Sequence, residues 1–148
     1  MPDEAYRAVF LRVHPTGKMV LSLTTEPDGR ENDYAELVAS ELGVPPLDVK
    51  VVPADEFRFG RGHGFNTAPS AGAPAAIASA ARKIRAKAQV LAGAALETPP
   101  AALAWDNGAF LRDGDRRTIA DLALYAHGTG MLPPGVEGGL DAQTVYRD

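Results

Sequence analysis

Residues 19–52 read MVLSLTTEPDGRENDYAELVASELGVPPLDVKVV, and this stretch decides the fold. Apolar residues alternate over residues 19–23 and return at 49–52, which predicts a strand at each end. Between the strands, from about Asn32 to Leu42, apolar residues fall on one helical face, and Asn32 or Asp33 can cap the helix start. Gly43 follows where a left-handed residue commonly ends a helix. The order strand, helix, strand over this length is typical of one βαβ crossover.

The residues on either side extend this unit. Alternation over 8–13, followed by a turn at 15–18, predicts that the first strand pairs with residues 19–25 as an antiparallel hairpin. A longer helix is expected from about Ala71 to Leu96, because apolar residues recur there at spacings of four and three. That stripe consists of Ile77, Ala81, Ile84, Ala88, Leu91 and Ala95.

The remaining third of the chain contains short elements. Asn107-Gly108 lies between two apolar runs and predicts a second hairpin. Thr118 and Asp121 resemble a capping box at the start of a short helix, and a final strand is expected at 143–146. We therefore predict one α+β domain over residues 1–148, with two main helices and one short helix packed on a mixed sheet of short strands.

Composition excludes several classes of protein. The chain has 148 residues, a net charge of −4 and no cysteine. Mixed charge argues against a nucleic-acid-binding module, and the lack of cysteine excludes disulfides and thiolate metal sites. No apolar run is long enough to cross a bilayer, and residues 1–5 lack a hydrophobic signal region. The expected compartment is the cytoplasm.

A glycine-rich loop precedes the long helix. Residues 60–72 read GRGHGFNTAPSAG. Glycines let a ligand approach the main chain, and the helix start that follows offers N–H groups and partial positive charge to an anion. The same residues are also compatible with a surface turn that ends in a helix cap. The glycine spacing does not match a dinucleotide-binding loop, and no Gly-Lys-Ser/Thr follows as in a P-loop.

No catalytic residue or metal ligand is predicted from the residues themselves. The three histidines, His14, His63 and His127, are far apart and lack the spacing of a metal site. Only His63 lies among the loop glycines, where it is either a ligand contact or an exposed loop residue. Acidic residues at 28, 31 and 33 are explained by their place before a helix start, and no serine has a nucleophile-elbow context.

Several segments, taken in order, carry a resemblance. They are PDGRENDYAE at 27–36, ELGVPPLDV at 41–49, GFNTA at 64–68, AARKIRAKA at 80–88 and LPPG at 132–135. They resemble the molybdenum-binding subunit of the xanthine dehydrogenase and aldehyde oxidase family, which includes the aerobic carbon monoxide dehydrogenases. The family reads GQGHETxYAQ, then ELGVPxxDV, then GSRST before a helix rich in Ala, Arg and Lys. The resemblance covers most of this chain but about a fifth of a family subunit.

The resemblance implies a molybdopterin-binding fold and a cofactor, either molybdopterin or its cytosine dinucleotide. Main-chain N–H groups of the glycine-rich loop would face the phosphates, and the loop before the first helix would lie near the pterin. Two positions depart from the family: Asp28 replaces a glutamine, where its carboxylate would repel anionic groups, and Asn66 replaces an arginine. The implied cofactor-binding positions are Asp28, Gly29, Gly62, Gly64, Asn66 and Thr67.

The resemblance also implies partners. The Gly-Val-Gly-Glu motif that carries the family's catalytic glutamate does not occur among these residues, so catalysis would need another chain to supply the general base. The expected partners are the rest of the molybdenum subunit and the iron–sulfur and flavin subunits, and uncovered faces also predict a homo-oligomer. The alternative is a degenerate, noncatalytic binding or assembly module of the same fold, with the cofactor lost.

Overall fold

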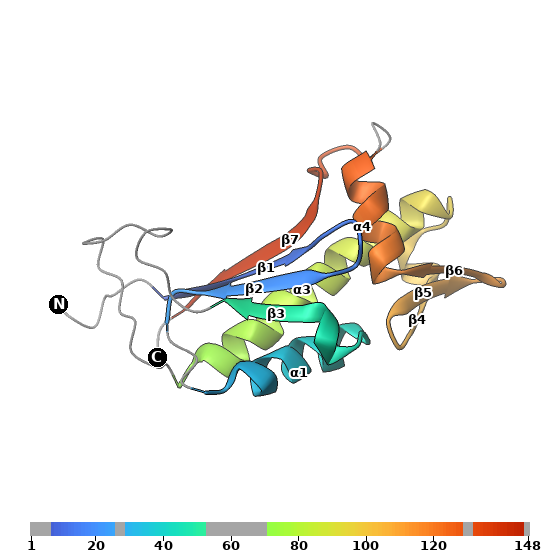
Figure 1. Cartoon of the computed structure of the whole chain (residues 1–148). Coiled ribbons are helices and arrows are strands. Elements are labelled where there is room, and N and C mark those ends of the chain that lie inside the picture. Colours follow the sequence, from blue (N-terminus) through green and yellow to red (C-terminus); the bar gives the residue numbers. More distant parts are fainter. Residues whose placement is uncertain (1–6, 26–28, 53–70, 129–131, 147–148) are drawn as a thin grey trace.

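A four-stranded mixed sheet forms the centre of the molecule (Figure 1). The computed structural model describes residues 7–25, 29–52, 71–128 and 132–146. The sheet order is β3-β2-β1-β7, in which β1 is antiparallel to both of its neighbours and β3 is parallel to β2. The strand bounds are β1 Ala8–Val13, β2 Met19–Leu23, β3 Val49–Val52 and β7 Leu140–Val145.

The first hairpin and the crossover agree with the sequence predictions. Leu11 of β1 lies opposite Leu21 of β2, and both are fully buried because alternate residues of each strand face the helices. Helix α1, Glu31–Leu42, then connects β2 to the parallel strand β3. A short 3₁₀ turn, η2 at Pro46–Asp48, leads into β3.

The two ends of α1 behave differently. Gly43 ends the helix in the left-handed region at φ 65°, as predicted, and its N–H donates to the carbonyl of Ala39. The prediction of an Asn32 or Asp33 cap is wrong, because the helix begins earlier and Arg30 occupies the N-cap position without a side-chain cap bond. Asn32 and Asp33 consequently lie inside the first turn.

Helix α3, Ala73–Ala95, provides most of the core on the covered face of the sheet. It packs against α1, β1, β7 and the short helix α4, Ile119–Gly128. Within its apolar stripe, Ile77, Ile84 and Leu91 are fully buried, whereas Ala95 at the end is only half-buried. Each fully buried Ile or Leu stabilises the fold by about 1.5–3 kcal/mol. Alanines between them allow α3 to lie close to the sheet.

A second, three-stranded antiparallel sheet packs beside the far end of α3 (Figure 1). The 3₁₀ turn η3 precedes it at Pro100–Ala102. Asn107 and Gly108 both have positive φ, 42° and 97°, and form the hairpin turn that the sequence predicts. The third strand was not predicted, because its polar sequence, Asp-Arg-Arg-Thr, has no apolar alternation. The strands are β4 Ala104–Asp106, β5 Ala109–Arg112 and β6 Asp115–Thr118.

The capping box at the start of α4 is confirmed in both directions. The Thr118 N–H donates to Asp121 Oδ2 at 2.9 Å, and the Asp121 N–H donates to Thr118 Oγ1 at 3.1 Å. Strand β7 follows and starts earlier than predicted, at the buried Leu140. Over the described ranges, none of the helices combines the length and apolarity needed to cross a bilayer.

Candidate functional site

The carboxyl ends of β2 and β3 and the amino ends of α1 and α3 all lie at one end of the sheet (Figure 1). This arrangement follows from the parallel crossover, since each strand runs toward that end and each helix returns from it. Ligands of α/β sheets bind in the crevice beyond the carboxyl ends of strands. We call this region the cofactor edge. Both loops singled out from the sequence connect elements there.

The first loop leads from β2 into α1. Asp28 lies outside the described residues. Gly29 is exposed and has φ 78°, and a Cβ built on it would meet nothing within 4 Å. Glycine is therefore favoured there by the backbone conformation and not by crowding, and the space beside it leaves the main chain accessible to a ligand.

The second loop leads from β3 into α3, and the structure describes only its two ends. The predicted positions Gly62, Gly64, Asn66 and Thr67, together with His63, lie outside the described residues. Val52 ends β3 and Gly72 precedes α3, and both flank the cofactor edge. The connection therefore starts and finishes there, while the roles of its individual residues remain predictions.

Two helix amino termini meet at the cofactor edge, and neither has a side-chain cap bond. The N-cap of α3 is Gly72, which has no side chain to offer, and the first turn of α3 contains no acidic residue. The first turn of α1 carries Glu31 and Asp33, which offset part of the positive potential there. The start of α3 is therefore the more favourable end for an anionic group such as a phosphate.

Tyr34 and Arg30 add polar groups at this edge that sequence reasoning did not assign to a site. Tyr34 is 4% exposed, and its burial raises the pKa of the phenol above the usual 10.0. The Arg30 guanidinium, which hydrogen-bonds the phenol, opposes this shift in the pKa of Tyr34. Arg30 follows Gly29 directly, at the position where the family motif has histidine. A cation at this position of the motif is the sequence signal that would have pointed to Arg30 as a site residue.

Thr24 fixes the point from which the first loop leaves the sheet. Its Oγ1 accepts a hydrogen bond from the Ala8 N–H at 2.9 Å and donates one to the Ala8 carbonyl at 3.3 Å. Its own N–H also donates to that carbonyl, at 3.2 Å. Thr24 is 1% exposed, so these bonds replace lost hydration. They hold the exit of β2 against the start of β1.

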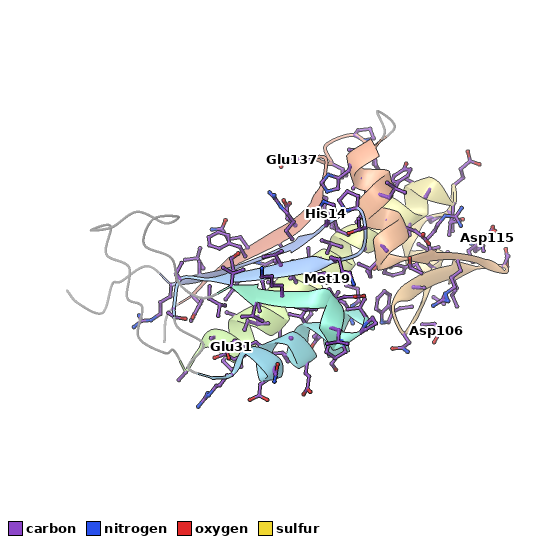
Figure 2. All side chains as sticks on the ribbon, viewed as in Figure 1. His14, Met19, Glu31, Asp106, Asp115 and Glu137 are labelled. Atoms are coloured by element: carbon purple, nitrogen blue, oxygen red, sulfur yellow. The ribbon has the colours of Figure 1, made fainter. Side chains whose placement is uncertain are left out.

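The other histidines with described positions lie elsewhere. His14 belongs to the turn between β1 and β2, at the opposite end of the sheet from Glu31 and the cofactor edge (Figure 2). Its Nδ1 lies 3.0 Å from Thr16 Oγ1. His127 lies in the last turn of α4, where a cation is favoured by the helix dipole. Neither contributes to the cofactor edge.

Taken together, the described residues at the cofactor edge fit an anionic, phosphate-bearing group. The main chain at Gly29 is approachable, two helix starts supply N–H groups, and Arg30 supplies a cation. An α+β domain whose helix starts and strand ends gather at one end of the sheet suits a ligand bound at the loops there.

Comparison with known proteins identifies the family. Residues 2–148 match the model of the molybdopterin cofactor-binding domain. The carbon monoxide dehydrogenase large chain of Afipia carboxidovorans is 36% identical over 144 residues, and that of Hydrogenophaga pseudoflava is 38% identical over 144 residues. Each match covers 92% of this chain and 17% of the relative. This chain belongs to the molybdopterin cofactor-binding domain family.

Solved structures agree with this assignment. The reconstituted CO dehydrogenase from Oligotropha carboxidovorans superposes with a TM-score of 0.81 at 33% identity, covering 97% of this chain and 18% of that chain. Quinoline 2-oxidoreductase from Pseudomonas putida 86 superposes with a TM-score of 0.75 at 26% identity, covering 96% of this chain and 19% of that chain. The chain thus spans less than a fifth of the length of these proteins, and the resemblance noted in its sequence is confirmed.

Proposed function

We propose that residues 1–148 act as a single domain that contributes to the binding of molybdopterin, or of its cytosine dinucleotide, in a molybdenum hydroxylase. The observation that carries the proposal is the meeting of two helix starts and two strand ends at the cofactor edge, in a chain of this family. Helix starts and exposed glycine backbone suit the cofactor phosphates.

Individual roles follow from position in the two loops. The main chain at Gly29 would lie near the pterin, with Asp28 beside it. Main-chain N–H groups at Gly62, Gly64 and Thr67 would face the phosphates, with Asn66 replacing the family's arginine. The bound molybdenum centre would supply the redox chemistry. The residues of this chain would bind and orient the cofactor without carrying a catalytic role.

Catalysis then depends on other polypeptides. No Gly-Val-Gly-Glu motif occurs in residues 1–148, so the general base would come from the rest of a molybdenum subunit. Iron–sulfur and flavin subunits would accept the electrons. The chain would work as an oxidoreductase component only in that assembly.

The test is cofactor analysis of the chain purified together with its co-expressed neighbouring subunits. We expect molybdenum and released pterin in stoichiometric amounts with the chain. An absence of molybdenum with all neighbouring subunits present would contradict the proposal. It would favour the alternative, a noncatalytic assembly module, which the replacements at Asp28 and Asn66 support.

The Asp28→Gln variant restores the glutamine that the family has at this position, and it tests whether the carboxylate of Asp28 weakens cofactor binding. Removing the carboxylate removes its repulsion of the anionic cofactor, so we expect cofactor occupancy to rise. The measurement is molybdenum content per chain in variant and parent, purified in parallel. Equal occupancy would show that repulsion at position 28 does not limit binding.

A further inference from the structure

The two edge strands of the four-stranded sheet, β7 and β3, differ in the side chains that hydrogen-bond to them. At the β7 edge, Lys83 of α3 donates from Nζ to the carbonyl of Gln143 at 2.8 Å and to Thr144 Oγ1 at 3.2 Å. Thr144 Oγ1 in turn donates to Ser79 Oγ at 3.3 Å. A lysine placed over an edge strand occupies its acceptors and discourages pairing with another chain.

At the β3 edge, by comparison, no side chain of the described residues hydrogen-bonds to the backbone of β3. A groove of about 370 Å³ runs between β3 and α1. Its apolar lining consists of Ala35, Pro46, Leu47, Val49 and Val51. We call it the α1–β3 groove.

Leu47 extends the apolar surface of this groove into solvent. It is 96% exposed, the highest value among the exposed large hydrophobic residues of the described ranges. Its 3₁₀ turn is anchored, because Lys18 Nζ donates to Asp48 Oδ1 at 2.6 Å. A single exposed leucine is ordinary, but this one continues a groove that also leaves Val51 half-buried.

The rim of the groove is acidic. Glu31 and Glu36 of α1 line it, and both are exposed. A matching surface would present an apolar segment flanked by Lys or Arg. A second copy of this chain does not fit that requirement, because a symmetric contact would bring the same acidic rim against itself.

We propose that the α1–β3 groove docks the remaining polypeptide of a molybdenum subunit, through an apolar segment with flanking basic residues. This inference rests on the proposed function. Its support is the β3 edge, to which no described side chain bonds, together with the exposed Leu47, the acidic rim and the share of the relatives' length that this chain spans, 17%. A domain that makes up so little of its relatives must present surfaces to the rest of them.

Photo-crosslinking in the native assembly locates the contact. A photoreactive amino acid at position 47 of the tagged chain, expressed with its neighbouring subunits, is expected to crosslink to the polypeptide that matches the rest of a molybdenum subunit. Mass spectrometry should place the crosslink in an apolar segment with adjacent Lys or Arg. The control is the same amino acid at position 124, because Leu124 is also exposed, at 59%, on α4. Crosslinking from position 47 to a second copy, to a different subunit or to nothing overturns the proposal.

Substitutions measure the strength of the contact. Leu47→Glu should lower co-purification of the molybdenum-subunit polypeptide by about tenfold, and Glu36→Lys should also lower it. Leu124→Glu and Glu137→Lys introduce the same changes on other exposed positions and should leave co-purification unchanged. Far-ultraviolet circular dichroism checks that Leu47→Glu folds. Equal co-purification of Leu47→Glu and the parent chain contradicts the proposal.

Molybdenum and pterin content of the same preparations separates the two hypotheses. Docking without molybdenum contradicts the proposed function and leaves the contact at the groove in place. Molybdenum bound to a chain that shows no contact at position 47 contradicts only the docking proposal.

Discussion

Two buried polar side chains lie where β2 leaves the sheet and α1 begins. Thr24 ties the exit of β2 to the start of β1, and Tyr34 lies under Arg30 in the first turn of α1. The sequence places Tyr34 on the apolar face of a helix, which is correct. Its polar surroundings could not be predicted, because Tyr146, which also raises its pKa, comes from the other end of the chain.

Replacing Thr24 tests the anchor at the cofactor edge. Thr24→Val keeps the shape of the side chain but leaves the Ala8 N–H without its Oγ1 acceptor. We expect the free energy of unfolding to fall by about 1–3 kcal/mol, because a buried donor loses its partner. Chemical denaturation measures the change, and Thr24→Ser, which keeps the hydroxyl, should recover most of it. Equal stability of Thr24→Val and the parent would show that the anchor is unimportant.

Because of Tyr34, the free energy of unfolding is expected to depend on pH in the alkaline range. Burial raises the pKa of its phenol above 10.0, so the folded state holds this proton more tightly than the unfolded state. The contribution of Tyr34 is complete below the unfolded pKa of about 10 and is lost as pH rises through the folded pKa. The free energy of unfolding should therefore decline above about pH 10.

The Tyr34→Phe variant should lose part of this alkaline decline, since it removes the titrating group. Denaturation at a series of alkaline pH values gives the slope for each protein. A Tyr34→Phe slope identical to that of the parent would assign the decline to other groups.

At the scale of elements, a contact between two glycines joins α1 to the second sheet. Local signals predict both residues independently, Gly43 as a helix end and Gly108 as a hairpin turn. The structure brings their backbones together: a Cβ on Gly43 would collide with the backbone of Gly108. Gly108 also accepts a hydrogen bond from the Ile119 N–H at 3.2 Å, at the start of α4. Neither signal contains information about this contact, because the residues are far apart in the chain.

Gly43→Ala should be strongly destabilising for two reasons. A left-handed backbone costs a residue with a Cβ about 1–2 kcal/mol, and the collision with Gly108 adds to this. Gly114→Ala is the matched control, because Gly114 has φ 90° but nothing within 4 Å of its Cβ position. Thermal or chemical unfolding should therefore show a larger loss for Gly43→Ala. Equal losses of stability would mean that the second sheet moves away from the added Cβ without lowering the free energy of unfolding.

On the scale of the whole molecule, the two sheets differ in how completely they are enclosed. Strand β1 is paired on both sides, and Val9, Leu11 and Val13 are fully buried. Strands β4 and β6 form the outer edges of the second sheet, and all of their side chains are exposed or half-buried. Local opening therefore requires far less loss of burial in the second sheet than in the first.

Native-state hydrogen exchange should resolve this difference. We expect amides of β1 to exchange only through global unfolding, and amides of β4 and β6 to exchange through local opening at lower free energy. Mass spectrometry or NMR over a series of low denaturant concentrations gives both values. The same opening free energy for β1 and β6 would show that the two sheets unfold as one unit.

Periodicity and turn residues in the sequence determined the first hairpin, the crossover, the long helix and the α4 capping box. These are local patterns, in which each residue's neighbours along the chain carry the signal. Strand β6 and the capping residue of α1 escaped prediction because polar residues there follow no period. Membership of the molybdopterin-binding family was also readable in the order of short motifs.

Tertiary structure alone decided which of these elements meet. The cofactor edge exists because a parallel crossover returns both helices to the same end of the sheet. The acidic groove beside β3 and the Gly43–Gly108 contact likewise join residues that are separated along the chain. Sequence patterns report which face of an element is apolar, whereas the packing of those faces depends on the whole chain folding at once.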